Sequence, residues 1–315
     1  MTRTGSIIWL AGVVLCIALG AYPALAHVSE QGLALLLPTT FYMISGVAAV
    51  ALTIVLVAVL PHRYAARLFS RTALFSVTPP KLETVTSLAA LALLMFLIYV
   101  GLNGSRDPLE NPLPLFIWTV WWVGFVCVQA IFGDLWRWLN PWTGIYGIIG
   151  APPMLALPAR LGVWPAIVAF VGFFAFALAD LSPDDPDRLA RVVGGYWACS
   201  FIGMLLFGGD QWLSRGECFT VLLRNYARLS PLGFRDNKLC LGMPGWQLLD
   251  APAATVSGAI FIVIVLASGA FDGLNETFWW LARIGVNPLE FPGRSAVVGP
   301  TVTGLVAVGL LLPVV

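Results

Sequence analysis

The stretch VTSLAALALLMFLIYVGL, Val85 to Leu102, is 18 residues long and contains no charged side chain. A helix rises about 1.5 Å per residue, so an apolar run of this length is close to the roughly 30 Å of a bilayer's hydrocarbon core. The whole chain is similar, with 59% hydrophobic and 10% charged residues and a mean hydropathy of +0.88. Such a composition is typical of a membrane protein, embedded in a lipid bilayer. The net charge of +1 gives no general attraction to nucleic acid.

Similar apolar runs recur along the chain and predict an all-α, polytopic membrane protein with about seven transmembrane helices. The predicted spans are residues 38–60, 85–102, 113–132, 163–179, 192–208, 252–270 and 296–315. The last run reaches Val315 without the polar or interfacial flank that usually follows a helix in lipid. Two interpretations stay open, namely a chain shortened at its C-terminus and a chain that stops at the membrane surface.

The N-terminal segment resembles a secretory leader. A positively charged start precedes a 14-residue apolar run, Ile7 to Gly20, which is short for a spanning helix. Ala24 and Ala26 then fit the small-x-small pattern of a signal-peptidase site. The sequence therefore predicts a signal peptide over residues 1–26 and a helical transmembrane domain over 27–315, with an uncleaved signal anchor as the alternative.

Cleavage there would leave the mature N-terminus outside the cytoplasm and would place the loops 61–84, 133–162 and 209–251 inside. Eleven of the 17 Lys and Arg residues lie in these three loops, and five lie in loops on the other side. This asymmetry agrees with the positive-inside rule. The sequence thus predicts which loops share a side of the membrane.

The segment FGDLWRWLNPW, residues 132–142, places two opposite charges and three tryptophans at the predicted inner end of a span. Indole rings favour the headgroup level of a bilayer, so an aromatic belt is the default interpretation of the tryptophans. Asp134 and Arg137 are at i, i+3 and either neutralise each other on a helix or belong to a functional site, because ionisable groups near membrane depth often mark one.

The motif Gly-Asp-x-Trp occurs twice, at residues 133–136 and 209–212. A short internal duplication and coincidence both explain it. If the duplication is real, Asp134 and Asp210 could face one another across a shared pocket, where neighbouring carboxylates would provide an acid and a base.

Two inner loops carry further patterns. Residues 212–229 alternate apolar and arginine side chains, which predicts a helix lying in the inner membrane interface with its arginines facing anionic headgroups. In the loop 133–162, Gly144, Gly147 and Gly150 indicate either a surface loop or a segment packed closely on a neighbouring helix.

Two places could hold a divalent metal ion. Asp272 and Glu276, in FDGLNETFWW (residues 271–280), are at i, i+4 and would share one helical face. His27, as a free N-terminus, would offer an amine and an imidazole to a copper-type ion. The bland alternatives are solvated carboxylates and an incidental histidine.

Three segments together carry a resemblance to a known family. Gly133 to Trp142, Trp212 to Leu232 and Phe271 to Thr277 resemble the fenitrothion hydrolase-like proteins, which are polytopic proteins of the bacterial inner membrane. The likeness runs from about residue 24 to 295. It departs from the family pattern at residues 209–211, where the family has a Gly-Arg-Glu-like sequence, and this weakens the pairing of the two aspartates.

The resemblance implies a membrane-bound enzyme that hydrolyses the P–O–aryl bond of organophosphorus triesters, together with a second membrane subunit. It also implies a bacterial inner-membrane location with a periplasmic mature N-terminus, and family members longer than this chain. Such hydrophobic small-molecule substrates partition into bilayers, so an intramembrane cleft lined by Trp, Phe and Leu would concentrate them.

The histidine content limits the mechanism. Soluble phosphotriesterases hold two metal ions mainly through several histidines, whereas this chain has only His27 and His62, predicted on opposite sides of the membrane. Carboxylates, another subunit or an incidental activity are the remaining explanations. The carboxylates predicted to have acid/base or metal-binding roles are Asp134, Glu217, Asp272 and Glu276.

Other classes of protein stay open or are unsupported. A non-enzymatic transporter or metal-handling protein, with His27 sampling metal, and a structural subunit that stabilises a partner are the alternatives to a hydrolase. The sequence has no Walker motif, dinucleotide fingerprint, haem-attachment CxxCH or serine nucleophile elbow. ATP-driven, nicotinamide-dependent and serine-hydrolase functions therefore have no support in the sequence.

Overall fold

The computed structural model describes residues 69–76, 82–236, 238–275 and 277–285, together with isolated residues outside these ranges. The chain forms two compact units, Met1–Pro61 and His62–Val315. In the first unit, the described residues between 44 and 59 are helical, within the predicted span 38–60. The predicted signal peptide and, apart from Gly299, the predicted last span lie outside the described residues.

Four helical segments of the second unit are long and apolar enough to cross a membrane. They are Glu83–Asn103 (α4), Pro112–Phe132, Pro186–Phe207 (α10) and Val256–Gly273, the last within α14 (Val256–Asn275). A fifth apolar helix, α9 (Trp164–Ala179), has 16 residues and extends about 24 Å. Five predicted spans thus coincide with described helices, and four of these have spanning length. The prediction of a helical protein with apolar transmembrane-type helices is confirmed to this extent.

The outward surfaces of these helices are apolar. Phe96 on α4 is 57% exposed, Ile202 on α10 is 54% exposed, and Leu266 on α14 is 68% exposed. Large contiguous apolar surface is unfavourable in water, whereas it matches the hydrocarbon of lipid. These surfaces are therefore the ones expected to contact the bilayer.

The second apolar segment is one continuous helix with three kinds of winding. It begins with α5 (Pro112–Pro114), where the Asn111 side chain accepts a hydrogen bond from the Leu113 amide at 3.0 Å. It continues as a π-helix, η2 (Leu115–Phe125), and ends as α6 (Val126–Phe132). π-helical winding is usually limited to single turns, and it is frequent at functional sites. This π-segment has 11 residues and is therefore longer than usual, which makes the helix a candidate part of a functional site.

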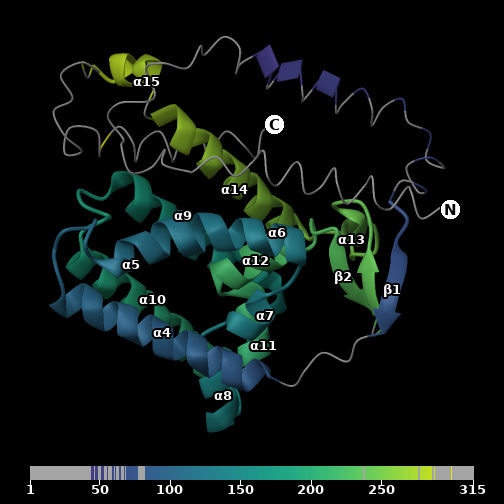
Figure 1. The fold of residues 1–315 in the computed structure, drawn as a ribbon, viewed down its shortest axis with the longest axis horizontal. Helices are drawn as coiled ribbons and strands as arrows, with labels where there is room; N and C mark the ends of the chain where they lie inside the picture. Colours follow the sequence, from purple (N-terminus) through teal and green to yellow (C-terminus); the bar gives the residue numbers. More distant parts are fainter. Residues whose placement is uncertain are drawn as a thin grey trace. The chain divides into compact units, whose positions relative to one another are not determined.

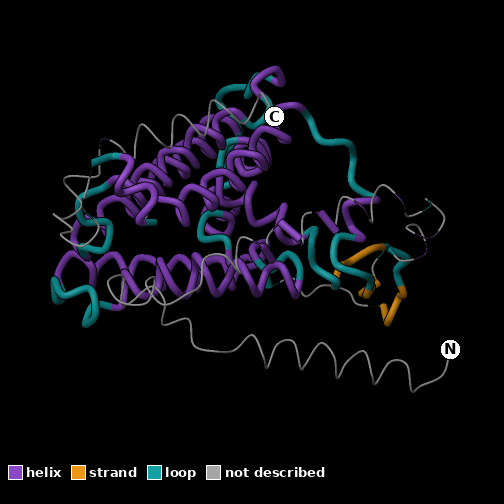
Figure 2. The backbone as a smooth tube through the Cα atoms, turned by 90° about the horizontal axis from the view of Figure 1, so that it is seen from above, coloured by secondary structure: helices purple, strands orange, loops and turns teal. Residues whose placement is uncertain are grey.

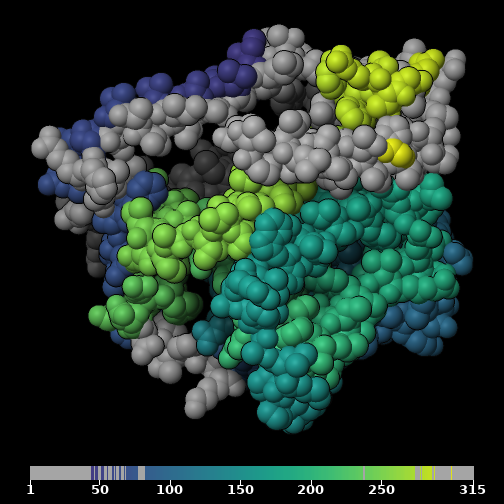
Figure 3. Space-filling view, turned by 180° about the vertical axis from the view of Figure 1, so that it is seen from behind, coloured from purple at the N-terminus to yellow at the C-terminus, as the bar shows by residue number. Residues whose placement is uncertain are grey.

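The helix α12 (Cys218–Ala227) lies inside the helical unit, against α6, α9 and α11 (Gly209–Arg215). Phe219 and Leu222 share a buried apolar cluster with Phe170 of α9 and Phe261 of α14. The prediction of an interfacial helix over residues 212–229 is wrong for this part, because all six residues from Cys218 to Leu223 are buried. Six consecutive buried residues cover every side of a helix, so this part packs in the core, while Arg224 directly after it is exposed. Figure 3 shows α14 in yellow-green against the green and teal helices.

Three short helices follow the long ones at their ends. They are α7 (Trp136–Leu139), α8 (Thr143–Ile149) and α11 (Gly209–Arg215). The helix α8 lies at the N-terminal end of α4 (Figure 1), where the Gly144 amide donates to Ser87 Oγ at 2.7 Å. A Cβ on Gly144 would lie 2.9 Å from the same oxygen. Close packing of the glycine-rich segment is thereby confirmed at Gly144, but Gly147 makes no such approach.

A small antiparallel sheet, which the pattern of apolar runs did not predict, lies beside the helices (Figure 2). Its strands, in the order β1-β3-β2, are β1 (Thr72–Ser76), β3 (Lys238–Leu241) and β2 (Leu232–Arg235). Phe75 pairs with Leu239, and Leu239 pairs with Phe234 on its other side. The helix α13 (Trp246–Leu249) fastens the sheet, since Gln247 Nε2 donates to the Leu232 carbonyl at 3.0 Å. The all-α prediction therefore requires this addition.

The sheet bears on the predicted sidedness of the loops. Its strands come from the loops 61–84 and 209–251, and paired strands must lie on the same side of a membrane. On the other side, Arg106, in the loop after α4, forms a 2.9 Å ion pair with Asp185, just before α10. Both contacts join loops that the positive-inside rule had grouped together. The grouping agrees with the contacts, while the absolute orientation stays a prediction. The remaining elements are η3 (Ala159–Leu161) and α15 (Phe278–Arg283).

Candidate functional site

An apolar pocket of about 770 Å³ lies among α4, η2, α7, α9, α10 and α12. Aromatic side chains dominate its wall. They include Phe116, Trp118, Trp121, Phe125, Trp136, Trp142, Phe173, Phe176, Tyr196, Trp197 and Phe219. Trp, Phe and Leu side chains were predicted to line a cleft for hydrophobic molecules, and these residue types line this pocket.

The π-helix forms one wall of this pocket. Phe116, Trp118 and Trp121 all come from η2. Trp118 stacks on Phe173 of α9, with ring centroids 5.9 Å apart, and Trp121 meets Phe219 of α12 edge to face at 4.7 Å. Wider winding changes the angle between successive side chains, and here it presents three aromatic rings within six residues to one cavity.

A second, polar pocket of about 600 Å³ adjoins the first, and Trp136 lines both. Its charged residues are Glu83, Asp134, Arg137, Asp210 and Arg224. Its other polar side chains include Thr84, Asn140, Thr143, Ser214 and Thr220. Three carboxylates and two guanidinium groups thus meet where α4, α7, α11 and α12 come together.

Asp134 is positioned by a break in the chain after α6. Gly133, at φ 91°, ends that helix, and a Cβ there would lie 3.1 Å from the Leu232 carbonyl oxygen. The buried Gln129 organises the break, because its Nε2 donates to Asp134 Oδ1 at 3.1 Å and its Oε1 accepts from the Leu135 amide at 3.0 Å. Gln129 was not among the predicted site residues, because in the sequence its amide resembles that of any polar residue at a helix end.

Asp210 reaches the same pocket from a second break. The helix α10 ends at Phe207, Gly208 follows at φ 86°, and α11 begins at Gly209. Asp134 and Asp210 therefore do line one pocket. The two breaks are not equivalent, because the glycine with positive φ directly precedes Asp134 but stands two residues before Asp210.

The expected i, i+3 pair of Asp134 with Arg137 is wrong. Arg137 forms its ion pair with Glu83 of α4, with a nitrogen–oxygen distance of 2.6 Å. The reason is that α7 begins at Trp136, so Asp134 lies outside the helix that carries Arg137. The helical spacing on which the expectation rested does not exist there.

The aromatic-belt interpretation is also wrong for two of the three tryptophans. Trp136 is 6% exposed and Trp142 is 3% exposed, so both belong to the core. Trp136 Nε1 donates to Thr220 Oγ1 at 2.9 Å, and Asn140 Nδ2 donates to the same oxygen at 3.2 Å. These bonds fix the wall between the two pockets. The indole nitrogen finds a protein partner and has no need of the headgroup region.

Glu217 has a structural place away from the polar pocket. It caps the N-terminus of α12, where its carboxylate accepts from the Phe219 amide at 2.9 Å and the Thr220 amide at 2.5 Å. The Tyr196 hydroxyl also donates to it and lies 3.2 Å from Cys218 Sγ. Burial raises the pKa of the Glu217 carboxyl, against the opposing effect of these hydrogen bonds. The structure does not bring Glu217 together with Asp134 in one cavity.

The proposed metal positions are only partly within the described residues. Asp272 is exposed on α14, whereas Glu276 and His27 lie outside the described residues. Within the part of the chain that the structure describes, no group of three or more His, Cys, Asp or Glu side chains could hold a metal ion.

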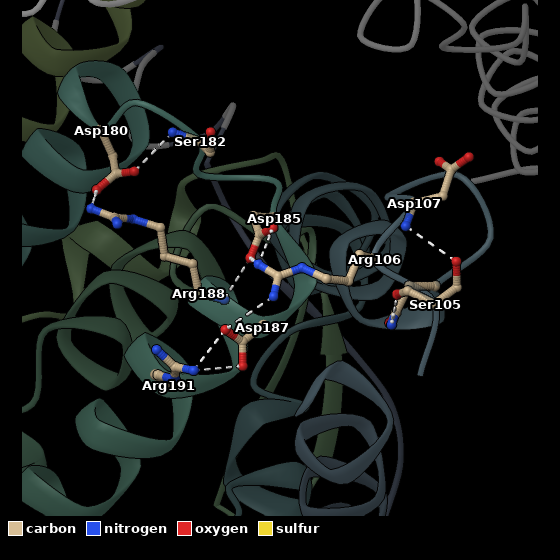
Figure 4. Close-up of polar contacts among 10 residues, drawn as sticks. Ser105, Arg106, Asp107, Asp180, Ser182, Asp185, Asp187, Arg188 and Arg191 are labelled. Atoms are coloured by element: carbon tan, nitrogen blue, oxygen red, sulfur yellow. Dashed lines mark hydrogen bonds and ion pairs between the residues drawn. The ribbon is translucent and has the colours of Figure 1, made fainter. Parts of the chain in front are cut away.

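A separate charged cluster lies at the C-terminal end of α4 and the N-terminal end of α10, away from the polar pocket (Figure 4). Arg106 pairs with Asp185, Arg188 with Asp180, and Arg191 with Asp187. Asp185 also caps α10, accepting from the Arg188 amide at 2.9 Å. The Arg188 amide and, to a smaller extent, the Arg106 side chain hold the pKa of Asp185 below its usual value. Each arginine has a carboxylate partner; the pairs of Arg106 and Arg188 join neighbouring segments, while the pair of Arg191 lies within α10.

Comparison with known proteins adds no relative. No family model, curated protein or solved structure matches the chain. The two pockets and the resemblance of the sequence are therefore the observations that bear on function.

Proposed function

We propose that this protein is a hydrolase of organophosphorus triesters, embedded in the bacterial inner membrane with its mature N-terminus in the periplasm. The observation that supports it is the contact between an apolar pocket and a carboxylate-lined pocket, which share Trp136. An aryl phosphotriester has the same two parts, an apolar ring and a polar phosphoryl centre. The resemblance of three sequence segments to fenitrothion hydrolase-like proteins supports the same class of substrate.

In this proposal the aryl group binds among the tryptophans and the phosphoryl group faces the polar side of Trp136. A water molecule attacks phosphorus, a carboxylate of Asp134 or Asp210 accepts its proton, and the P–O–aryl bond breaks to release an aryloxide. Asp134 is the better candidate base because Gln129 fixes one of its oxygens. Glu217 supports α12 in this scheme, while Asp272 and Glu276 keep their proposed metal-binding role, together with His27.

The test is nitrophenol release from fenitrothion by the purified full chain in detergent, with and without chelator. Turnover above a heat-treated sample supports a hydrolase, and loss with chelator would indicate a divalent metal. Absence of turnover from the chain alone is followed by the same assay in native membranes, which retain a second subunit. Absence there as well rejects the proposal.

A transporter is the second candidate, and one feature favours it. Two apolar helices are interrupted at glycines with positive φ, Gly133 and Gly208, and each interruption delivers a carboxylate to one pocket. Interrupted helices at a shared polar site are typical of secondary transporters. Uptake into proteoliposomes without any chemical change of the solute would favour this function over hydrolysis.

A further inference from the structure

Only two of the five charged residues of the polar pocket neutralise each other. Glu83 and Arg137 neutralise each other at 2.6 Å, and Asp134 holds a single hydrogen bond from Gln129. For Arg224 and Asp210, the described part of the chain provides neither an ion pair nor a side-chain hydrogen bond. The pocket therefore presents one guanidinium and two carboxylates to whatever enters it.

These groups are held in place by the core. Arg224 follows directly on Leu222 and Leu223 of α12, which are 2% and 1% exposed. Its backbone position is thus fixed although its side chain is exposed. Asp210 stands in the first turn of α11, directly after Gly209, where a Cβ would lie 2.8 Å from the Tyr146 ring. The guanidinium of Arg224 and the carboxylate of Asp210 therefore favour a ligand that has both a negative and a positive group.

The pocket lies where apolar helices end. Glu83 begins α4, Asp134 follows the apolar segment Pro112–Phe132, and Asp210 follows α10. When these three segments cross a bilayer, the pocket stands at the depth of lipid headgroups. The apolar pocket on the other side of Trp136 lies toward the hydrocarbon.

We infer that the polar pocket binds a zwitterionic phosphoester headgroup, with its phosphate on Arg224 and its primary ammonium on Asp210 and Asp134. A guanidinium binds phosphate oxygens through two parallel hydrogen bonds. A primary ammonium has three N–H donors for carboxylates, whereas a quaternary ammonium has none and is recognised by aromatic cages. An anionic headgroup without an amine leaves both aspartates facing negative charge. The order of affinity follows as ethanolamine first, then choline, then glycerol.

This inference concerns binding and does not rest on the proposed hydrolysis. Its test is calorimetric titration of the purified full chain in detergent with short-chain phosphatidylethanolamine, phosphatidylcholine and phosphatidylglycerol, and with free phosphoethanolamine. We expect phosphatidylethanolamine to bind at least about tenfold more tightly than phosphatidylcholine, since hydrogen bonds to charged groups have this size. Binding of the lipid but not of free phosphoethanolamine identifies a membrane lipid as the ligand, and binding of both identifies the headgroup alone.

Variants distinguish the roles of the two charges. Arg224→Gln should weaken phosphatidylethanolamine binding at least about tenfold, with partial recovery in Arg224→Lys. Asp210→Asn should remove most of the preference for ethanolamine over choline. Arg228→Gln is the matched control, because Arg228 lies one turn further along and donates to Asn225 at 3.4 Å. Equal affinity for all three lipids, or equal loss in the Arg228 and Arg224 variants, would overturn the inference.

Discussion

The two polar ends of the helical unit use their charges in opposite ways. At the end shown in Figure 4, three arginines each form an ion pair, two of them with Asp180 and Asp185 at helix ends and one with Asp187 within α10. At the end that forms the polar pocket, Glu83 and Arg137 are the only ion pair among the five charged lining residues. Paired charges stabilise loops, whereas charges fixed without partners beside apolar helices usually mark a site for a ligand.

The carboxylates Asp185 and Asp134 illustrate this difference. Both stand at the end of an apolar helix, but Asp185 accepts from a helix amide and from Arg106, while Asp134 accepts only from Gln129. The charge of Asp185 is neutralised by contacts that stabilise the fold. Asp134 keeps most of its hydrogen-bonding capacity for a substrate, a water molecule or a ligand.

Removing both pocket aspartates is the strongest test of this comparison. We expect Asp134→Asn with Asp210→Asn to lower turnover of fenitrothion at least about 100-fold, the size of a general-base contribution. The same change at Asp107, which accepts from the Leu109 amide on the opposite side, should leave turnover unchanged. Initial rates of nitrophenol release measure both. Full activity in the double variant would remove the polar pocket from the mechanism.

Substitution of Glu217 tests whether this carboxylate, which lies outside the polar pocket, stabilises the fold. Glu217→Ala removes a helix cap and leaves two amides without an acceptor, so the free energy of unfolding should fall by about 2–3 kcal/mol. Glu217→Gln, which keeps an acceptor, should cost less. Chemical denaturation in detergent measures both variants. An alanine variant as stable as the wild type would show that the cap is unimportant.

The raised pKa of Glu217 adds a pH dependence with a definite sign. The carboxyl ionises at a higher pH in the folded protein than in the unfolded chain. Its contribution to stability is therefore complete below the unfolded pKa and is lost as the pH rises through the folded pKa. We expect Glu217→Gln to remove this loss, because an amide does not ionise in this range. Unfolding curves at several pH values measure the difference between the two proteins.

The sequence predicted apolar helices of spanning length at four of the seven expected places, because an apolar run is a local property. It located the helices α4, α10 and α14, and it grouped the loops that the sheet later joins. The aspartates of the pocket were also visible, as charges at the ends of apolar runs. These predictions needed only composition, length and the order of the segments along the chain.

The parts that failed depend on distant residues. Arg137 pairs with Glu83 rather than with Asp134, and the indole of the buried Trp136 donates to Thr220, 84 positions away. The roles of Gln129, which positions Asp134, and of the π-winding of η2, which lines the apolar pocket, likewise depend on residues distant in the sequence. No local pattern distinguishes an interfacial tryptophan from a buried one when both follow an apolar helix.

Gly144 sharpens the comparison at the pocket end, since it lines the polar pocket and contacts α4. Gly144→Ala places a methyl group against Ser87 and the Thr84 carbonyl oxygen, so stability should fall by about 1–3 kcal/mol through overpacking. Gly147→Ala, in the same helix, meets nothing within 4 Å and should stabilise by up to about 1 kcal/mol through helix propensity. Thermal unfolding of the pair measures this contrast. Equal effects would show that α8 is not packed on α4 as described.

The smallest effects are expected from single charges, and they should differ in kind at the two ends. Asp185→Ala removes the cap of α10 and should cost about 1 kcal/mol. Because the pKa of Asp185 is lowered, this contribution is present above the ordinary carboxyl pKa and is lost as the pH falls through the lower folded value. Arg224→Gln removes no ion pair within the described residues, so its unfolding temperature should match that of the wild type. If the Asp185 variant were as stable as the wild type and the Arg224 variant were less stable, the two roles would be reversed. Arg224 would then stabilise the fold, and Asp185 would not.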